Sequence, residues 1–339
     1  MAQLNIEVFT MAKKAVEVKN LVKAFKGGVK AVDKITFSID EGEFFGFLGP
    51  NGAGKTTTMR ILATLTKPTS GRALVNGFDV VKNPNEVRRS IGFAMQAVGL
   101  DDLATAWENL QLIGCLYGMS RKEAKKRAGE LLELLKLEDA AGRYVAKYSG
   151  GMRRRLDIAV ALMHRPKILI LDEPTEGLDP AGRRVVWQYL ENLNRDGVTV
   201  LLTTHYMEEA DYLARNLAII NGGKIVAAGT PQNLKKTIRE SHIEVELKER
   251  TRASTIICQK FPKLPCRNTT TGLEVVSPNG DADLPRILKL LGDAKVRVKG
   301  FNLHTPTLED VFLKFAGHGF ENEESGKGND PYLAMRRRG

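Results

Sequence analysis

Cysteine is scarce in this sequence, with three residues among 339. Cys115, Cys258 and Cys266 do not form the Cys-x-x-Cys pair that zinc sites and redox motifs use. The sequence therefore argues against a disulfide-rich extracellular domain and against a cysteine-based metal centre. We expect the three thiols to be buried or incidental, in a chain that works in a reducing compartment.

Long apolar runs are also missing. The longest apolar segments, such as residues 168–171 and 198–202, have the length of strands, whereas a helix needs about 20 apolar residues to cross a bilayer. The N-terminus has no long apolar segment followed by a small-residue cleavage site, so no secretory leader is predicted. Met11 begins a second plausible start, and we expect residues 1–14 to be an extension ahead of the first domain.

Acidic residues are outnumbered by basic ones, 40 to 51, which gives a net charge of +11. Nucleic acid and an anionic membrane surface are both possible partners for such a chain. A solvated basic surface together with an anionic-ligand site explains the charge equally well, so the charge leaves the partner open. At 42% hydrophobic residues, the chain can bury a sizeable core, and its length suffices for two domains.

The strongest signal is a glycine-rich segment at residues 49–56 with the spacing G-x-x-x-x-G-K-[ST]. It lies between an apolar strand predicted over residues 44–48 and a helix predicted over residues 55–65. Glycine lets backbone N–H groups approach a phosphate, and the helix N-terminus attracts negative charge. Lys55 and Thr56 add a cation and a hydroxyl for Mg²⁺. The predicted phosphate site comprises Gly49, Pro50, Asn51, Gly52, Ala53, Gly54, Lys55, Thr56 and Thr57.

Apolar strands alternate with helices over most of the chain, which predicts an α/β fold with a mostly parallel sheet over residues 15–238. A helical subdomain is predicted at about residues 97–165, where Ser120 and Glu123 form a capping box. Strands are predicted at residues 16–18, 35–39, 44–48, 91–94, 168–171, 198–203, 217–220 and 224–228, and helices at 107–117, 121–135, 151–163 and 181–194.

Residues 239–317 differ in character and predict a small C-terminal α+β domain without a catalytic motif. The tail, residues 318–339, is rich in Gly, Asn, Glu and Lys and is predicted to be mobile. The predicted strands of this domain cover residues 242–247, 273–276 and 296–303, and its helices 254–260, 284–291 and 307–316.

Polar residues that follow the apolar strands are the candidates for catalysis. Asp172 ends one strand, so its carboxylate is expected at the carboxyl edge of the sheet, where Thr56 can share a Mg²⁺ ion with it. Glu173 is the candidate general base or water-orienting group. His205 and Gln96 follow two further strands. His205 can contact the terminal phosphate and the attacking water, and Gln96 can reach Mg²⁺ or the water through its amide. Simpler interpretations exist for all four residues. Asp172 and Glu173 could belong to a helix-capping loop, and His205 and Gln96 could be ordinary structural or loop residues.

Ser149, Gly150 and Gly151 open another helix and form a second anion-binding helix end. One nucleotide site does not need two such helix ends from one subunit. We therefore expect this element to complete the site of a second copy, in a two-fold dimer that sandwiches ATP.

These elements, in this order, resemble the ATP-binding subunits of ABC transporters, which have a P-loop NTPase fold, over about residues 15–237. Phe25 stands where the family carries an aromatic residue that stacks on adenine, although a packed core residue is the alternative. The resemblance identifies residues 49–57 with the Walker A motif, Gln96 with the Q-loop, residues 148–152 with the signature motif, residues 168–173 with the Walker B motif, Asp179 with the D-loop and His205 with the H-loop.

A closer resemblance is to drug-export ATPases of the daunorubicin-resistance type, through residues 148–159 (YSGGMRRRLDIA) and 307–318. Tyr148 and Met152 depart from the commoner Leu and Gln of the signature motif. The resemblance implies an ATPase with ATP and Mg²⁺ as cofactors, in which Thr56, Gln96 and Asp172 surround the metal.

The resemblance further implies a peripheral protein on the cytoplasmic face of the cell membrane, working as a homodimer with a separate integral-membrane permease. The loop that contains Asp101, Asp102 and Leu103 is expected to dock on that permease, and a drug-like or lipidic molecule would be exported.

The main alternative is a soluble, non-transport ABC ATPase that acts on ribosomes or nucleic acid. Such chains carry two ATPase modules or long coiled-coil insertions, which this sequence lacks, so no nucleic-acid partner is expected. A regulatory protein that uses the fold as a switch is a second alternative.

Overall fold

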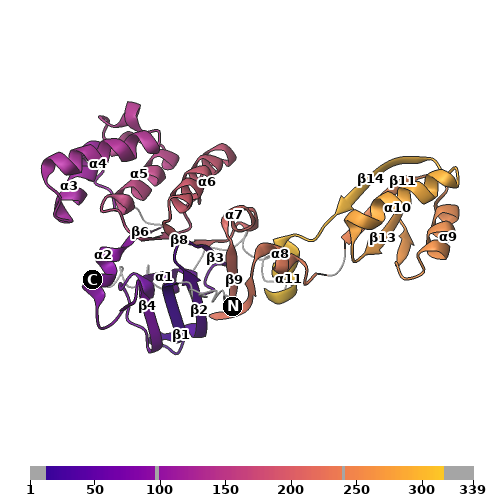
Figure 1. Cartoon of the computed structure of the whole chain (residues 1–339), viewed down its shortest axis with the longest axis horizontal. Helices are drawn as coiled ribbons and strands as arrows, with labels where there is room; N and C mark the ends of the chain where they lie inside the picture. The colour runs from indigo at the N-terminus through magenta and orange to yellow at the C-terminus, as the bar shows by residue number, and fades with distance from the viewer. Residues whose placement is uncertain (1–12, 96–98, 239–240, 317–339) are drawn as a thin grey trace, which may run out of the picture. The chain divides into compact units, whose positions relative to one another are not determined.

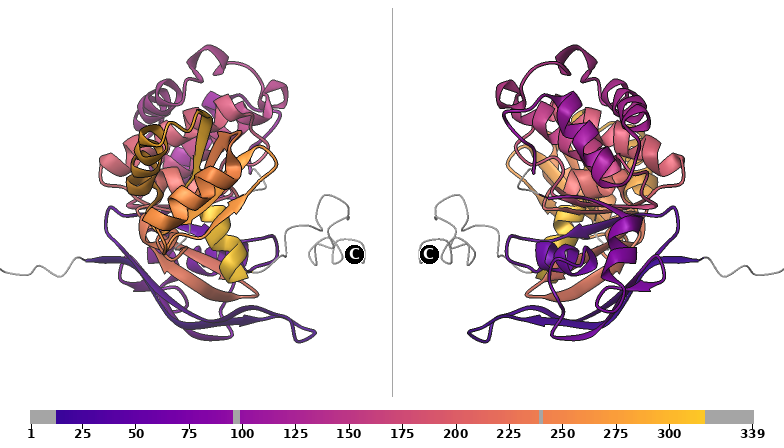
Figure 2. Two further views of the ribbon diagram at one scale, coloured as in Figure 1. Left: turned by 90° about the vertical axis from the view of Figure 1, so that its right-hand side faces the viewer. Right: turned by 90° about the vertical axis from the view of Figure 1, so that its left-hand side faces the viewer.

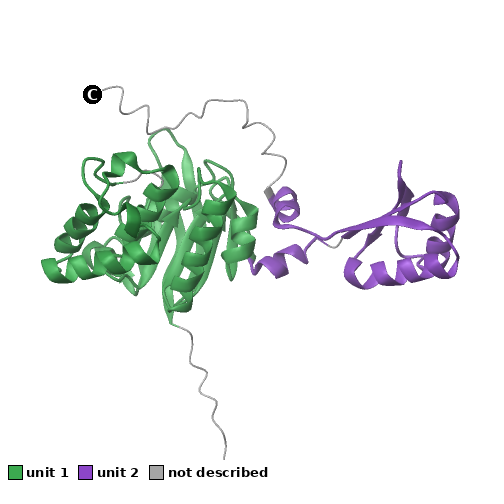
Figure 3. Ribbon diagram, turned by 90° about the horizontal axis from the view of Figure 1, so that it is seen from above, with its two compact units in different colours: residues 1–228, 316–339 green, residues 229–315 purple. Residues whose placement is uncertain are grey.

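The computed structural model describes residues 13–95, 99–238 and 241–316 (Figure 1). The chain divides into two compact units, and the second comprises residues 229–315 (Figure 3). None of the described helices combines the length and the apolar content that crossing a membrane requires.

A six-stranded sheet with the order β10-β9-β3-β8-β7-β6 forms the centre of the first unit. Strand β3 pairs in parallel with β8 and β9, and β7 pairs in parallel with β6 and β8, which confirms the mostly parallel sheet. Every residue of β3, β7 and β8 is buried, so these strands are covered on both faces. The strands are β3 (Phe44–Leu48), β6 (Ile91–Ala94), β7 (Ile168–Asp172), β8 (Thr199–Thr204), β9 (Asn216–Asn221) and β10 (Lys224–Gly229).

A second, antiparallel sheet with the order β2-β1-β4-β5 lies on the opposite side of the central sheet from the helices of the predicted subdomain (Figures 1 and 2). Helix α1 (Lys55–Leu62) buries Met59, Ile61 and Leu62 in one core with residues of both sheets. The sequence predicts only short parts of two of these strands, which are β1 (Lys14–Ala24), β2 (Lys30–Asp40), β4 (Ser70–Val75) and β5 (Phe78–Asp79).

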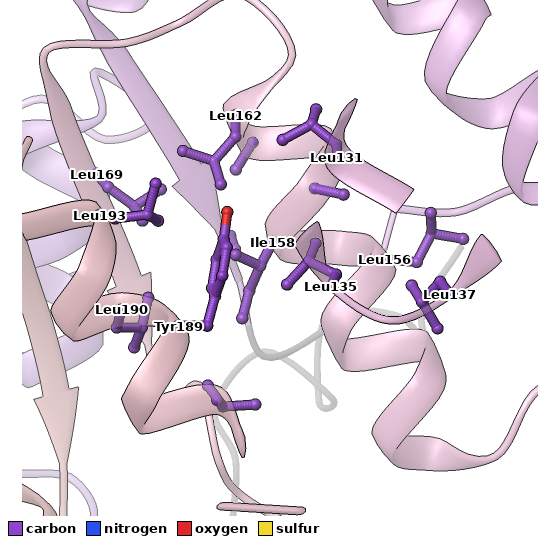
Figure 4. Packing of buried hydrophobic residues seen from close by; sticks show 14 of the residues in the cluster. Leu131, Leu135, Leu137, Leu156, Ile158, Leu162, Leu169, Tyr189, Leu190 and Leu193 are labelled. Atoms are coloured by element: carbon purple, nitrogen blue, oxygen red, sulfur yellow. The ribbon is translucent and has the colours of Figure 1, made fainter. Parts of the chain in front are cut away.

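The helical subdomain contains α3 (Ala106–Leu116), α4 (Arg121–Leu134) and α5 (Gly150–Leu162). The capping box of Ser120 and Glu123 is confirmed at the start of α4, and α3 begins with an unpredicted one at Thr105 and Glu108. Leucines of α4 and α5 pack against β7 and α6 (Pro180–Arg195) in one apolar cluster (Figure 4). This cluster joins the subdomain to the central sheet. The remaining helices of the first unit are α2 (Pro84–Ser90) and α7 (Met207–Leu213).

The second unit is built on an antiparallel sheet with the order β12-β13-β11-β14. Strand β11 alternates between buried and more exposed residues, and its buried Ile243 and Val245 pack with Ile257 and Ile287 of two helices. The predicted small α+β domain is thus present. Its elements are β11 (Ser241–Leu247), β12 (Cys266–Asn268), β13 (Gly272–Ser277) and β14 (Val298–His304), with α8 (Pro231–Lys235), α9 (Arg250–Lys260), α10 (Gly280–Asp293) and α11 (Leu308–Ala316).

None of the three cysteines is buried, so of the two possibilities expected from sequence, buried or incidental thiols, the first is wrong. Cys258 of α9 and Cys266 of β12 bring their sulfur atoms to 2.8 Å from each other, and Cys115 is exposed in the first unit. The spacing of the two cysteines in the sequence does not predict this pair. The thiols meet because the chain turns back between α9 and β12, which only the fold shows.

We predict that hydrogen peroxide joins Cys258 and Cys266 within one chain, because both thiols are accessible and already adjacent. The two thiols give up two protons and two electrons as the disulfide forms, and one hydrogen peroxide takes these up and becomes two water molecules. Thiol titration of the unfolded, oxidised protein should then detect one thiol in place of three. A Cys258→Ser control should form no internal disulfide, and peptide mapping that finds Cys115 in the bridge would contradict the prediction.

Candidate active site

The loop of residues 49–54 connects β3 to α1, as its sequence predicts. Gly54 has a φ of 107°, and a Cβ atom there would lie 2.2 Å from the carbonyl oxygen of Ala31. At Gly49 a Cβ atom would lie 2.3 Å from the carbonyl oxygen of Ile220. The loop is therefore wedged between β2 and β9, and only glycine fits at these two positions.

Lys55 is buried with its ammonium group directed into this loop. Its Nζ donates to the carbonyl oxygens of Gly49 at 2.6 Å and Pro50 at 3.2 Å. The same nitrogen lies 3.2 Å from Oε1 of Glu173, which is also buried. The phosphate loop therefore presents a positive charge with a carboxylate beside it, where a phosphate chain can bind.

Asp172 and Thr56 meet at the carboxyl end of β7. The hydroxyl groups of Thr56 and Thr203 donate to Oδ1 of Asp172 at 3.2 and 2.5 Å. Burial raises the pKa of Asp172, and these two hydrogen bonds oppose the rise. One carboxylate and one hydroxyl are oxygen donors of the kind that Mg²⁺ binds together with phosphate oxygens. The residues present thus fit the predicted metal.

Glu173 is held from several sides. The Nδ1 of His205 donates to Oε2 of Glu173 at 2.9 Å. The main-chain N–H of Glu173 donates to the hydroxyl oxygen of Thr203 at 3.0 Å. Burial alone would raise the pKa of Glu173, but the hydrogen bond from His205 and the positive charge of Lys55 outweigh burial and hold the pKa below its ordinary value. Glu173 is therefore a carboxylate at neutral pH.

Of three further predicted site residues, the structure describes two. Phe25 directly follows β1 and is half-buried, ahead of an exposed turn that leads to Ala31 of β2 and so to the phosphate loop. Asp179 is exposed and caps α6, where its Oδ1 accepts a hydrogen bond from the N–H of Gly182 at 3.1 Å. Gln96 lies outside the described residues.

Ser149 caps α5, and its hydroxyl accepts a hydrogen bond from the N–H of Met152 at 3.3 Å. Ser149 and Gly150 are exposed. Among the described residues, no hydrogen bond or ion pair joins residues 149–151 to residues 49–56. One connected group of side chains contains Lys55, Glu173, His205, Asp172 and Thr56. The predicted second anion site at residues 149–151 is not part of this group.

Thr203 is a site residue that sequence reasoning missed. It holds both the carboxylate of Asp172 and the backbone of Glu173. The available signal was weak: two threonines, Thr203 and Thr204, follow three apolar residues at the end of a strand, next to a histidine.

Comparison with known proteins gives two matching families. The family described as ABC transporter matches residues 32–176, and the family described as ATP-binding protein DrrA1-3-like, C-terminal domain, matches residues 229–316. The daunorubicin resistance ATP-binding protein DrrA2 of Streptomyces coeruleorubidus is 42% identical over 316 residues, which cover 92% of this chain and 98% of that protein.

The doxorubicin resistance ATP-binding protein DrrA of Mycobacterium tuberculosis is 39% identical over 306 residues, covering 88% of this chain and 92% of that protein. Among solved structures, a dimeric ATP-binding cassette in a post-hydrolysis state, bound to ADP and Pi, superposes with a TM-score of 0.59 at 33% identity. This match covers 63% of this chain and 98% of that one.

Proposed function

The chain belongs to the ATP-binding proteins of ABC transporters, and from this premise we propose that two copies of it enclose two Mg-ATP molecules and drive export through a separate permease. ATP hydrolysis coupled to transport follows from the family and from the ABC ATPase fold. Membership in this family favours transport over the alternative of an ATPase that acts on ribosomes or nucleic acid.

The observation that carries this proposal is the group formed by Lys55, Glu173 and His205 at the phosphate loop. Lys55 would exchange its carbonyl partners for the β- and γ-phosphates of ATP. Thr56 and Asp172, together with Gln96, would hold the Mg²⁺ ion. That ion, when bound, neutralises charge on the phosphates.

Glu173 would orient the attacking water. Because its pKa is lowered, the carboxylate is ionised at neutral pH and can accept a hydrogen bond from a water molecule in line with the γ-phosphate. His205 holds Oε2, which fixes the direction of the carboxylate. When Lys55 turns to a phosphate, Glu173 loses a counter-charge and becomes a stronger proton acceptor.

The second half of the site would come from α5 of the partner copy. At Gly150 no atom lies within 4 Å of an added Cβ, and at Gly151 the nearest atom is Leu178 Cδ2 at 3.4 Å. The fold of one chain therefore does not require glycine at either position, in contrast to Gly49 and Gly54. A phosphate group that approaches the helix N-terminus from outside the chain would explain both glycines.

The permease would dock on the helical subdomain. Leu103 is 85% exposed, although the loop around it is fixed by a hydrogen bond from its N–H to Asp101 and by an ion pair between Asp102 and Arg153 at 2.6 Å. Helix α3 adds the exposed Leu112 and Leu116, which share one helix face. An apolar side chain on a rigid exposed loop is typical of a protein contact.

We predict that a Leu103→Asp variant keeps the ATPase activity of the isolated subunit but no longer co-purifies with its permease. The substitution removes an apolar contact and places a charge in the proposed interface, which should weaken binding about 100-fold. Leu65, which is 51% exposed outside the subdomain, supplies the control variant Leu65→Asp. Equal recovery of permease with both variants would contradict this docking surface.

We further propose that the chain acts on the cytoplasmic face of the membrane, where ATP is available, and that its cargo is drug-like or lipidic. The two relatives are named for resistance to daunorubicin and doxorubicin. Inverted membrane vesicles that contain this chain and its permease should accumulate daunorubicin only when ATP is present. Vesicles with an inactive ATPase variant serve as the control, and uptake by those vesicles would argue against the proposal.

A further inference from the structure

Arg154 is a buried arginine on α5 that the proposed mechanism does not use. Its Nε donates to the carbonyl oxygen of Pro174 at 2.9 Å, and its Nη2 donates to the carbonyl oxygen of Asp172 at 2.6 Å. Its Nη1 donates to the carbonyl oxygen of Met95 and to Oδ2 of Asp157, the latter at 3.0 Å. One side chain thus connects α5 to two other segments of the first unit.

These segments are the ones that carry the proposed catalytic groups. Asp172 and Pro174 flank Glu173 in sequence, and Met95 directly precedes Gln96. Glu173 has a φ of 50°, in the left-handed region that residues other than glycine seldom occupy. Such a conformation persists only where the surroundings hold it. Arg154 holds the carbonyl groups on both sides of Glu173, while Thr203 holds its N–H.

Asp157 fixes the guanidinium group from one turn further along α5. Both side chains are buried, and burial raises the pKa of Asp157 to about 6, although the charge of Arg154 opposes the rise. The carboxyl group therefore remains largely ionised at pH 7. A buried arginine has five N–H donors in a rigid fork, which an ammonium group cannot reproduce across several carbonyl groups.

We propose that Arg154 is a positioning residue, which sets the backbone of Glu173 and of the segment before Gln96 relative to the nucleotide-facing end of α5. This inference rests on the proposed roles of Glu173 and of residues 149–151. Among the described residues, no hydrogen bond or ion pair joins Arg154 to the phosphate loop, so ATP binding through Lys55 does not depend on it. We therefore expect the loss of Arg154 to affect the turnover step more than nucleotide affinity.

A structural role alone is the competing explanation, and a double variant separates the two. Replacing a buried ion pair by apolar residues of similar size often leaves stability unchanged or higher. Arg154→Met combined with Asp157→Leu should therefore keep the fold, yet it removes the hydrogen bonds that Arg154 donates to the three carbonyl groups. Arg154→Lys provides a second test, because it retains the charge beside Asp157 but loses the fork.

Arg155→Lys is the matched control, because Arg155 lies on the same helix and also donates to carbonyl groups. Its Nη1 donates to the carbonyl oxygens of Leu135 and Lys136, at 2.9 and 3.3 Å, within the helical subdomain. Its Nε donates at 3.4 Å to the carbonyl oxygen of Gly151, one turn back in the same helix, and leaves the N–H of Gly151 free to face a phosphate. We expect the Arg154→Met/Asp157→Leu protein to lose about 100-fold in kcat with little change in KM for ATP, because a small displacement of a catalytic group is enough. Arg154→Lys should lose kcat in the same direction, and Arg155→Lys should stay within about twofold of wild type.

Wild-type kcat in either Arg154 variant would overturn the inference, and so would an equal loss in Arg155→Lys. If the double variant does not fold, the kcat of Arg154→Lys decides. Glu173→Gln, measured in parallel, tests the proposed function separately. Loss of hydrolysis in Glu173→Gln with full activity in the Arg154 variants refutes only the positioning role, whereas an active Glu173→Gln protein refutes the assignment on which that role rests.

Discussion

A Glu173→Gln variant is expected to bind ATP, to lose nearly all hydrolysis and to accumulate as an ATP-bound dimer. Glutamine keeps the shape of the side chain but removes the negative charge that polarises the attacking water, a loss of about 10²–10⁴-fold in rate. The phosphate loop and Lys55 remain intact, so nucleotide affinity should persist. Phosphate release measures the rate, and size-exclusion chromatography with Mg-ATP measures the dimer.

Glu208 offers the matched control, because it is an exposed glutamate on α7, three residues beyond His205. Glu208→Gln should hydrolyse ATP at the wild-type rate and should not trap a dimer. If Glu173→Gln hydrolyses ATP as fast as the wild-type protein, the assignment of Glu173 as the group that activates water is wrong. The pKa of Glu173 already lies below its ordinary value, so its charge should act throughout the neutral pH range.

The phosphate site could be predicted from sequence because its parts are consecutive in the chain. Residues 49–56 contain the loop, the cation and the hydroxyl, and the strand before them is a continuous buried run that the structure reproduces at Phe44–Leu48. Asp172 and Glu173 also directly follow a buried strand. In each case the local sequence pattern predicts a buried strand, and the site residues directly follow that strand in the folded protein.

The parts that sequence reasoning missed depend on partners far away in the chain. Strand β4 is only partly apolar, and its pairing with β1 determines its structure. Arg154 is one of three successive arginines, yet only Arg154 meets the carbonyl groups beside Glu173. Backbone carbonyls are present at every residue and leave no trace in the sequence, so these contacts appear only once the fold is known.

A Gly151→Asp variant is expected to fold and to bind ATP as an isolated subunit, but to lose ATP-driven dimerisation and hydrolysis. An added Cβ meets only Leu178 Cδ2 at 3.4 Å, and an acidic residue in the first turn of a helix is favourable. The carboxylate would repel the phosphates that the partner copy brings to this helix end. We expect at least about 100-fold loss of hydrolysis, measured by phosphate release.

Gly142→Asp is the control, because Gly142 is exposed in the same subdomain and an added Cβ there has open space. It should dimerise and hydrolyse ATP like the wild-type protein. Loss of ATP binding in the isolated Gly151→Asp subunit would instead place residue 151 in its own chain's nucleotide site.

Mixing Gly151→Asp with Lys55→Met separates a shared site from two internal ones. Each variant alone should be inactive. In a mixed dimer with shared sites, one site pairs the intact phosphate loop of the Gly151→Asp copy with the intact α5 end of the Lys55→Met copy. Random mixing should then restore roughly a quarter of the wild-type rate if the two sites act independently. If residues 55 and 151 served the same chain's nucleotide, every site in every dimer would carry one defect, and the mixture would stay inactive.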